Sequence, residues 1–282
     1  MLYVADQGRS CVVTLGSLDP RAPWSRLRAD AAAGSFREPY AVHVDPPLMV
    51  VADAGNDRVV GMDLGSGGCW VPQPSAEVGP LSAPRGVTVA GDLLVVADTG
   101  NHRVVTGSIG SGDPWTTFGR ATAGGSTGPG DFLAPTAVLV DARRRILVAD
   151  PGLGRLVRVD DPAGTGWTEV ALPAGCRPYG LAHGPGGTVL VTDQAGARVL
   201  TLAADDSVAV VVEGEPGRRL IAPVATVVHE GDLVVADAAT ASLTRWTESG
   251  GTWDLAERLG GDPGPAGGPE FSRLCGLAAT GA

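Results

Sequence analysis

The chain repeats one short motif six times. Residues 94–105 read LVVADTGNHRVV, which is an apolar segment, an aspartate, a Gly-Asn turn, an arginine and a second apolar pair. Related segments follow at intervals of 43 to 52 residues, and their aspartates are Asp6, Asp53, Asp98, Asp150, Asp193 and Asp237. This period is typical of an array in which each repeat is a small sheet. Because a catalytic residue is not usually needed six times, we predict a structural role for the motif.

Within the motif, two apolar runs separated by a Gly/Asn turn predict a β-hairpin. The aspartate can cap the backbone amides of the turn, and an arginine five residues later can fold back onto the carboxylate. Arginine occupies this place in four repeats, at Arg58, Arg103, Arg155 and Arg198, whereas Cys11 and Ser242 replace it in the other two.

Two further signals recur with the motif. An apolar segment, usually with a proline, precedes each hairpin and carries a small residue two places after the proline position: Ala41, Gly86, Ala137, Gly180, Ala225 and Gly276. These residues predict inner strands crowded about a central axis. A tryptophan follows the aspartate by 16 to 18 residues in five repeats: Trp24, Trp70, Trp115, Trp167 and Trp253. We expect these side chains to pack between neighbouring sheets.

Residues 84–105, and clearly also 39–60, resemble the NHL-repeat family in their proline, their inner-strand segment and their VAD-x-G-N-x-R-V hairpin. The resemblance covers essentially the whole chain and includes the Gly-rich leaders GGDPGPAGGPEF and GGSTGPGDF. It implies an all-β fold, a six-bladed β-propeller of four-stranded blades in a single domain of residues 1–282. The chain begins in a second strand and ends in a first strand. We therefore expect the N- and C-terminal strands to close the ring in one blade, formed by residues 272–282 and 1–30.

Composition agrees with one globular domain and bears on the compartment. No apolar run approaches the length of a membrane span. The N-terminus enters a strand at once, so we expect a cytoplasmic protein, with a removed leader peptide left open. We also expect a monomer. The four cysteines, Cys11, Cys69, Cys176 and Cys275, lack metal-ligand spacing and are expected to be free thiols. A disulfide between Cys11 and Cys275, which would share the closing blade, also stays open.

The charge of the chain bears on its partners. The net charge is −10, and all 21 basic residues are arginines. Some NHL propellers bind RNA through a basic face, which requires concentrated positive charge for phosphate contact. We therefore expect no nucleic acid and no anionic membrane surface as a partner.

The resemblance also indicates where a site would lie. In a propeller the loops that enter the first strands surround one mouth of the central channel, and ligand sites favour such mouths. The residue after each proline position predicts a ring there: Tyr40, Arg85, Thr136, Tyr179, Val224 and Cys275. Tyr40 and Tyr179 belong to blades three apart and should face each other, with Arg85 beside Tyr40. The residues Glu38, Arg177 and Arg273 lie on the entering loops, and the Gly-rich segment 119–130 is either a lid or a plain connection.

These residues suit chemistry without a metal. Phenols can donate hydrogen bonds to a carbonyl or enolate oxygen, and arginine can hold an anion. We therefore predict a small-molecule-binding propeller that requires no cofactor, and a lyase, isomerase or cyclase acting on a carbonyl-rich substrate as its possible activity. The candidate catalytic residues are Tyr40, Tyr179 and Arg85, and the candidate substrate-binding residues are Glu38, Thr136, Arg177, Arg273 and Cys275. The alternative for the tyrosines is structural, because their rings can simply cover the core.

Two other function classes stay open. One is a non-catalytic scaffold that binds a protein or peptide. The other is a metal-dependent enzyme, because the pattern is also similar to that of amidating lyases, with histidines around zinc, and of lactonase-like propellers, with carboxylates around calcium. His43, His183 and His229 fall four, five and six places after the proline position, and His102 lies in a hairpin turn. Different depths and alternating sheet faces follow from this spacing, so we predict no metal site.

Overall fold

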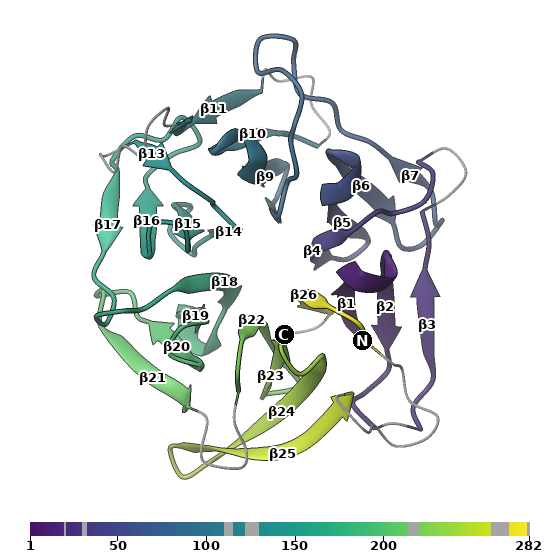
Figure 1. The fold of residues 1–282 in the computed structure, drawn as a ribbon, viewed down its shortest axis with the longest axis vertical. Helices are drawn as coiled ribbons and strands as arrows, with labels where there is room; N and C mark the ends of the chain where they lie inside the picture. Colours follow the sequence, from purple (N-terminus) through teal and green to yellow (C-terminus); the bar gives the residue numbers. More distant parts are fainter. Residues whose placement is uncertain are drawn as a thin grey trace.

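The computed structural model describes residues 1–19, 21–29, 33–109, 115–121, 130–213, 220–260 and 271–280. Within them, six antiparallel sheets of four strands stand around a central axis (Figure 1). The fold is therefore the six-bladed β-propeller that the repeats predicted. No helix in these ranges is long and apolar enough to cross a membrane.

Three blades follow one another from residue 39. Blade I contains β4 (Pro39–Asp45), β5 (Leu48–Asp53), β6 (Arg58–Asp63) and β7 (Cys69–Trp70). Blade II contains β8 (Gly86–Ala90), β9 (Leu93–Asp98), β10 (Arg103–Ser108) and β11 (Thr116–Phe118). Blade III contains β14 (Ala137–Val140), β15 (Ile146–Asp150), β16 (Arg155–Val159) and β17 (Thr168–Val170). A short parallel pair, β12 (Arg120–Ala121) and β13 (Asp131–Phe132), lies between blades II and III in the chain.

Two more blades and the closing blade complete the ring. Blade IV contains β18 (Pro178–His183), β19 (Val189–Asp193), β20 (Arg198–Leu202) and β21 (Val208–Glu213). Blade V contains β22 (Pro223–His229), β23 (Asp232–Asp237), β24 (Ser242–Ser249) and β25 (Thr252–Gly260). The closing blade contains β26 (Leu274–Ala279), β1 (Leu2–Asp6), β2 (Cys11–Leu15) and β3 (Trp24–Leu27). Single turns of 3₁₀ helix are η1 (Gln7–Arg9), η2 (Ala54–Asn56), η3 (Thr99–Asn101) and η4 (Pro185–Gly187).

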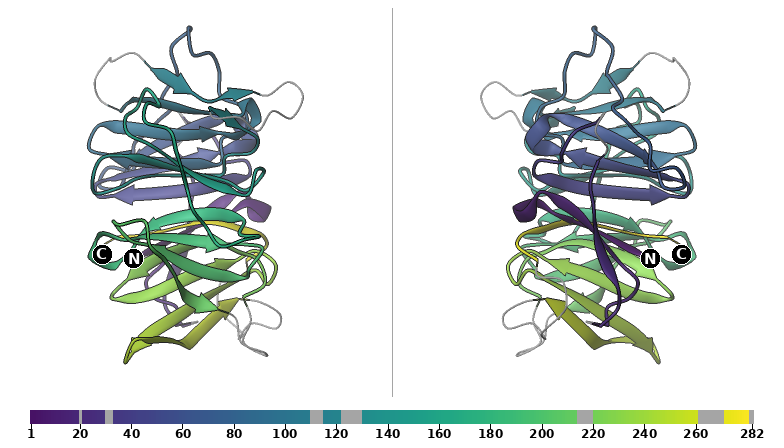
Figure 2. Two further views of the ribbon diagram at one scale, coloured as in Figure 1. Left: turned by 90° about the vertical axis from the view of Figure 1, so that its left-hand side faces the viewer. Right: turned by 90° about the vertical axis from the view of Figure 1, so that its right-hand side faces the viewer.

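The two chain ends close the ring as predicted. Strand β26 pairs antiparallel with β1, with Leu2 opposite Ala279 and Val4 opposite Leu277. Figure 2 shows both termini at the same face of the ring. Cys11 and Cys275 both lie in this blade, and both are free thiols. The prediction of a single domain with blade limits at 272–282 and 1–30 stays a prediction.

The core lies between neighbouring blades. Second strands are almost wholly buried because they have sheet on both faces, and all the residues of β15 and β19 are buried. Trp115, Trp167 and Trp253 pack into clusters shared by two blades, as expected. Trp24 is an exception because its side chain is 36% exposed on β3. Trp70 lies over Gly61 of its own blade.

The inner strands approach one another closely at their small residues, where alanine and glycine alternate from blade to blade. A Cβ at Gly86 would lie 2.8 Å from the Thr136 carbonyl oxygen, and one at Gly180 would lie 2.3 Å from the Val224 carbonyl oxygen. A Cβ at Gly276 would likewise lie 2.7 Å from the Tyr40 carbonyl oxygen and 2.7 Å from the Cα of Ala41. Glycine on one blade therefore makes room for the backbone of the next.

The repeated aspartates are buried and join two parts of each blade. All six are at most 1% exposed. Each accepts a hydrogen bond from a backbone amide of the loop that enters its own inner strand: Asp98 from Ser82 at 2.7 Å and Asp193 from Arg177 at 2.9 Å are examples. The amides of the hairpin turn also donate to some of them, as Gly196 does to Asp193. The aspartates thus have the structural role that their repetition predicted.

The arginines of the motif follow the prediction with one correction. The Nε atoms of Arg58, Arg103 and Arg198 donate to the aspartate five residues earlier at 2.7 to 2.8 Å. Arg155 does not follow this pattern, since its guanidinium donates to the Asp131 carbonyl oxygen and lies 3.7 Å from the Glu169 carboxylate. In the other three repeats one carboxylate oxygen accepts backbone amides and the other bonds to the arginine, whereas both oxygens of Asp150 accept amides, from Leu133 and Ala134 at 2.8 and 2.9 Å.

The buried aspartates predict an acid-sensitive stability. Burial raises the pKa of Asp193, but hydrogen bonds from Arg177, Gly196 and Arg198 outweigh it and hold the pKa below its ordinary value. The stabilisation by this carboxylate is therefore present above about pH 4 and is lost as the pH falls through the lower folded-state pKa. We expect Asp193→Asn to lower the free energy of unfolding by about 3 kcal/mol near neutral pH, and by less at about pH 3.

Urea unfolding followed by circular dichroism measures this difference. The matched control is Asp92→Asn, an exposed aspartate in the turn between β8 and β9, which should change stability by less than about 0.5 kcal/mol. An equal loss at both pH values would contradict the role of the carboxylate charge.

Candidate functional site

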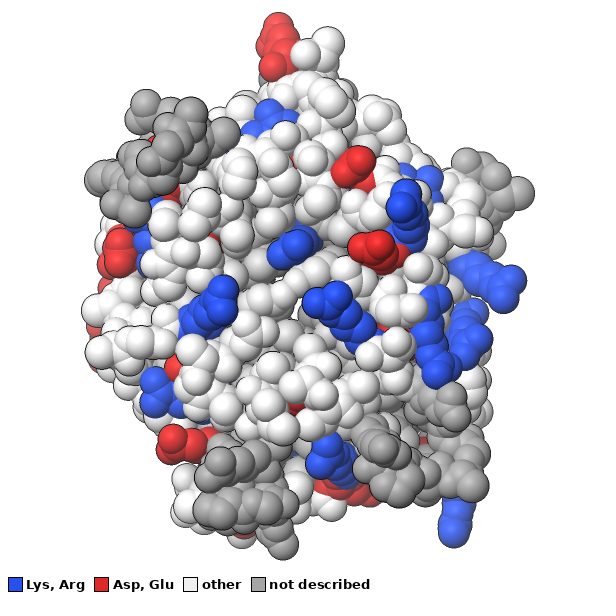
Figure 3. Space-filling model, in the orientation of Figure 1, with Lys and Arg blue, Asp and Glu red and all other residues white. Residues whose placement is uncertain are grey.

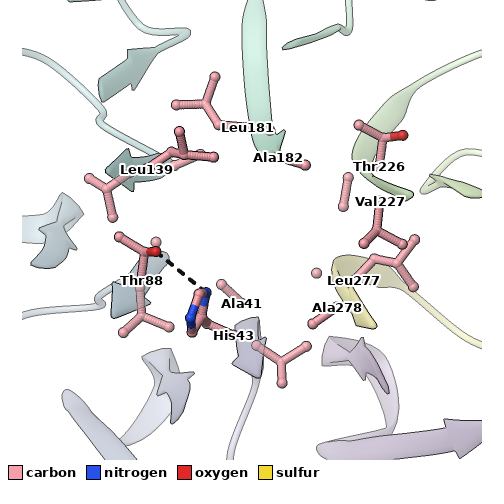
Figure 4. A pocket seen from close by; sticks show the side chains of 18 of the residues that line it. Ala41, His43, Thr88, Leu139, Leu181, Ala182, Thr226, Val227, Leu277 and Ala278 are labelled. Atoms are coloured by element: carbon pink, nitrogen blue, oxygen red, sulfur yellow. Dashed lines mark hydrogen bonds between the residues drawn. The ribbon is translucent and has the colours of Figure 1, made fainter. Parts of the chain in front are cut away.

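The six inner strands surround one central cavity of about 400 Å³. Its lining runs from Tyr40, Arg85 and Tyr179 at one end to Asp45 and Ala279 at the other. Figure 4 shows its wall side chains around the axis. Cavities that hold small molecules have volumes of about 300–1,000 Å³, so this one is large enough for a ligand.

Tyr40 and Tyr179 meet over the end of this cavity. The two hydroxyl groups are joined by a hydrogen bond, and the ring centroids are 6.5 Å apart. The Arg85 guanidinium lies over the Tyr40 ring, 4.9 Å from its centroid. The predicted opposition of the tyrosines, with Arg85 beside Tyr40, is therefore present. The structure adds that the hydroxyls are in direct contact, so that the pair bridges the channel.

Both tyrosines are in their protonated form. Burial, followed by the proximity of Tyr179, raises the pKa of Tyr40 far above its ordinary value. Burial likewise raises the pKa of Tyr179, although the hydrogen bond from Tyr40 and the charge of Arg85 act in the opposite direction. In a pair of phenols one O–H donates to the other oxygen, and the second O–H needs a different acceptor. Among the described residues, neither hydroxyl makes a hydrogen bond other than the one that joins the pair.

Arginines gather around the same opening. Arg85, Arg177 and Arg273 directly precede the inner strands β8, β18 and β26, which belong to alternate blades. Figure 3 shows arginine side chains around the central opening of this face. The charges of Arg85 and Arg273 both act on Tyr179 and Cys275. Within the described part of the chain, none of the three forms an ion pair, and the Arg177 Nε donates to the Pro151 carbonyl oxygen at 3.2 Å.

A short polar chain connects two other predicted residues beside the tyrosines. The amide nitrogen of Gln7 donates to the Glu38 carboxylate at 3.4 Å, and the Cys275 thiol donates to the Gln7 amide oxygen at 3.3 Å. Burial raises the pKa of Cys275 to about 12, even though Arg273 and Arg85 lower it. Cys275 is therefore a thiol at neutral pH, and Glu38 is the exposed carboxylate of this group.

Three remaining predictions concern the rim. The hydroxyl of Thr136 donates to the Tyr179 carbonyl oxygen at 2.8 Å, so it holds the tyrosine strand in place. Val224 is buried in the core. The predicted lid, 119–130, lies largely outside the described residues. Binding roles for Thr136, Arg177, Arg273, Cys275 and Glu38 stay predictions.

Below the tyrosines, the channel wall is mostly apolar, with Asp45 at its far end. Leu139, Leu181 and Leu277 contribute aliphatic side chains (Figure 4). The Nδ1 atom of His43 and the Thr88 hydroxyl lie 3.4 Å apart and bond to each other. Burial lowers the pKa of His43 to about 4, and it also lowers the pKa of His183. Both imidazoles are therefore neutral near pH 7.

The histidines do not form a metal centre. His43 and His183 line the cavity, whereas His229 is buried away from it, and His102 bonds to the Leu133 carbonyl oxygen. Across the described ranges, no group of three or more His, Cys, Asp or Glu side chains is arranged to hold a metal ion.

Several residues of the site were not predicted. Gln7 comes from the hairpin turn of the closing blade, and only its place in a repeat could have suggested that it is near the mouth. From the sequence, His43 was considered only as a metal ligand, and Thr88 was not considered. Their mutual hydrogen bond depends on which sheet face each side chain takes, which inner-strand spacing alone does not define.

The comparisons with known proteins agree with the fold. The NHL repeat family model matches residues 81–106, which confirms the resemblance in blade II. No curated protein sequence matches the chain.

Solved structures are similar over most of the chain. A chain of the nidogen/laminin complex has a TM-score of 0.70 at 14% identity, covering 98% of this chain and 97% of that one. A streptogramin B lyase has a TM-score of 0.65 at 13% identity, covering 90% and 78%. The virginiamycin B lyase of Staphylococcus aureus has a TM-score of 0.60 at 14% identity, covering 86% and 75%. At these identities the likeness shows the propeller fold and does not extend to activity.

The protonated tyrosine pair predicts the behaviour of the protein at high pH. Burial also raises the pKa of Tyr3, so all three tyrosines prefer the phenol form in the folded chain. Their contribution to stability is therefore present below about pH 10, the ordinary tyrosine pKa, and is lost as the pH rises above it. In an alkaline titration followed by ultraviolet absorbance, we expect phenolate to appear only together with the loss of the circular dichroism signal. Phenolate formation in the folded protein below about pH 10 would contradict this assignment.

Proposed function

Since this chain is a six-bladed β-propeller that carries an NHL repeat, we propose that it binds a small carbonyl or carboxylate compound at the channel mouth. The phenol pair supports the proposal most directly. Tyr40 and Tyr179 share one hydrogen bond, and one O–H remains for an acceptor that the described residues do not supply. A ligand oxygen at the mouth would provide that acceptor.

The charge of the mouth favours a ligand that carries negative charge. Arg85 and Arg273 act on the tyrosine and cysteine side chains, and neither forms an ion pair with an acidic side chain in the part of the chain that the structure describes. Hydrogen bonds to a charged acceptor are shorter and about twice as strong as those between neutral groups. A carboxylate oxygen at the phenols would therefore be stabilised by both the O–H donor and the surrounding guanidinium charge.

The same donors define the reaction class that fits. Protonated phenols and guanidinium groups can stabilise the developing charge of an enolate oxygen, but they cannot accept the proton that forms it. Glu38 is the carboxylate that is connected through Gln7 to Cys275 at the mouth, and we propose it as the base. A metal-independent lyase, isomerase or cyclase would use these groups. That two similar structures are lyases by name supports this class.

A protein partner is the second candidate. A chain of the nidogen/laminin complex shares the fold over 97% of its length. The exposed guanidinium groups of Arg177 and Arg273 would then meet acidic side chains of a partner.

Thermal unfolding with added ligand tests the first candidate. We expect small carboxylates and keto acids to raise the melting temperature, because a ligand that binds only the folded state stabilises it. Tyr179→Phe and Arg85→Gln should each reduce affinity about 10-fold, since each removes a hydrogen bond or charge worth roughly 1.5 kcal/mol.

Arg143→Gln is the matched control. It makes the same change of charge at an exposed position of the hairpin between β14 and β15. This hairpin is at the end of β14 away from the mouth. Its affinity should equal that of the wild type. Equal losses in Arg143→Gln and Arg85→Gln would mean that only the total charge matters and would remove the proposed site. No response to any small molecule, together with binding of an acidic peptide, would favour the second candidate.

A further inference from the structure

The structure also indicates the shape of the ligand. We infer that the channel takes an amphiphilic carboxylate, with its charged head between the tyrosines and arginines and an unbranched apolar chain in the central cavity. This inference rests on the proposed function and adds the part of the ligand that lies below the mouth.

The first argument is continuity. Arg85, Tyr40 and Tyr179 line the same cavity as Leu139, Leu181 and Ala279 further along the axis. The inner strand β4 has seven residues, which at about 3.3 Å per residue gives a channel wall of about 20 Å. A ligand anchored at the mouth can therefore extend a long chain without leaving the cavity.

The second argument is that the threonine hydroxyls of the wall already have partners within the protein. The Thr88 hydroxyl bonds to Nδ1 of His43, whose Nε2 is buried without a partner among the described residues. The Thr226 hydroxyl donates to the Val234 carbonyl oxygen at 3.1 Å, and that of Thr136 donates to the Tyr179 carbonyl oxygen at 2.8 Å. The threonine hydroxyls therefore do not require a polar ligand, and apart from His43, His183 and Asp45 the wall below the mouth is mostly Ala, Val and Leu. Such a wall favours hydrocarbon over a polar chain.

The third argument is charge. His43 and His183 line the cavity, and burial keeps both imidazoles neutral. The positive charge of the arginines is concentrated at the mouth, whereas the Asp45 carboxylate lies at the opposite end of the lining, so an anionic head is favoured at the mouth. The two ends of the site therefore favour a ligand that has a charged group at one end and an apolar chain at the other.

The tyrosine pair lies where head and chain would meet. A chain that passes between Tyr40 and Tyr179 must part their hydroxyls, which breaks one hydrogen bond. A carboxylate has two oxygens and can accept from both phenols. The bound head would therefore replace one hydrogen bond with two.

Isothermal titration calorimetry with a series of carboxylates tests the inference. The series is acetate, butanoate, hexanoate, octanoate and decanoate, each below its micelle concentration. Burial of each methylene contributes about 0.8 kcal/mol, so affinity should increase about 4-fold per added methylene. Affinity that is the same along the series would overturn the inference and leave the proposed function in place. Absence of binding by every member would overturn the proposed function itself.

A channel-filling variant locates the chain. Ala182 of β18 lies in the cavity wall (Figure 4), away from the mouth residues. We expect Ala182→Phe to bind acetate as the wild type does and to lose at least 10-fold in affinity for decanoate. Ala209→Phe, in the outer strand β21 of the same blade, is the matched control and should bind the whole series normally.

The outcome with acetate also reports on folding, because a variant that binds acetate normally is folded at the mouth. If Ala182→Phe does not fold, Ala278→Leu on β26 fills the cavity from another wall and serves the same purpose. Unchanged decanoate affinity in a folded channel-filling variant would show that the chain lies elsewhere and would overturn the inference.

Discussion

A buried carboxylate in every repeat connects the hairpin of each blade to the loop that enters its inner strand. The oxygens of Asp193 and Asp6 accept from the amides of Arg177 and Arg273, so two of the mouth residues are themselves part of this connection. Tyr179 follows Arg177 by only two residues. The positions of the mouth side chains therefore depend on bonds made inside the blade, and a site with several donors can stay organised on what are formally loops.

The radius of the ring depends on a second constraint, the alternation of glycine and alanine on the inner strands. Because a Cβ at Gly180 would overlap the Val224 carbonyl oxygen, glycine allows neighbouring inner strands to approach closely. This approach brings blades I and IV near enough for Tyr40 and Tyr179 to touch across the axis. The cavity below them has mostly apolar walls. Backbone packing in the ring and the chemistry of the mouth are thus two effects of the same small residues.

The sequence predicted the blades and the opposition of the tyrosines because both follow from counting repeats. It could not predict that the two hydroxyls touch, since this depends on the ring radius. The role of Arg155 was wrong for a similar reason, because competition from the amides of Leu133 and Ala134 for Asp150 involves a loop whose path the motif does not define. The sequence could not predict the channel wall either, because the hydrogen bond between His43 and Thr88 is a contact between two blades.

The arginines of the hairpin motif and those that precede the inner strands have different roles in this acidic chain. Where it follows the repeated aspartate by five residues, as Arg58, Arg103 and Arg198 do, its charge is neutralised inside the blade. Where it precedes an inner strand, as Arg273 does, its backbone amide donates to the carboxylate of the motif, and its guanidinium forms no ion pair among the described residues. The net charge of −10 therefore does not describe the mouth. Positive charge remains at the opening where the phenols also lack a second acceptor among the described residues, and the two features together favour an anionic ligand over a neutral one.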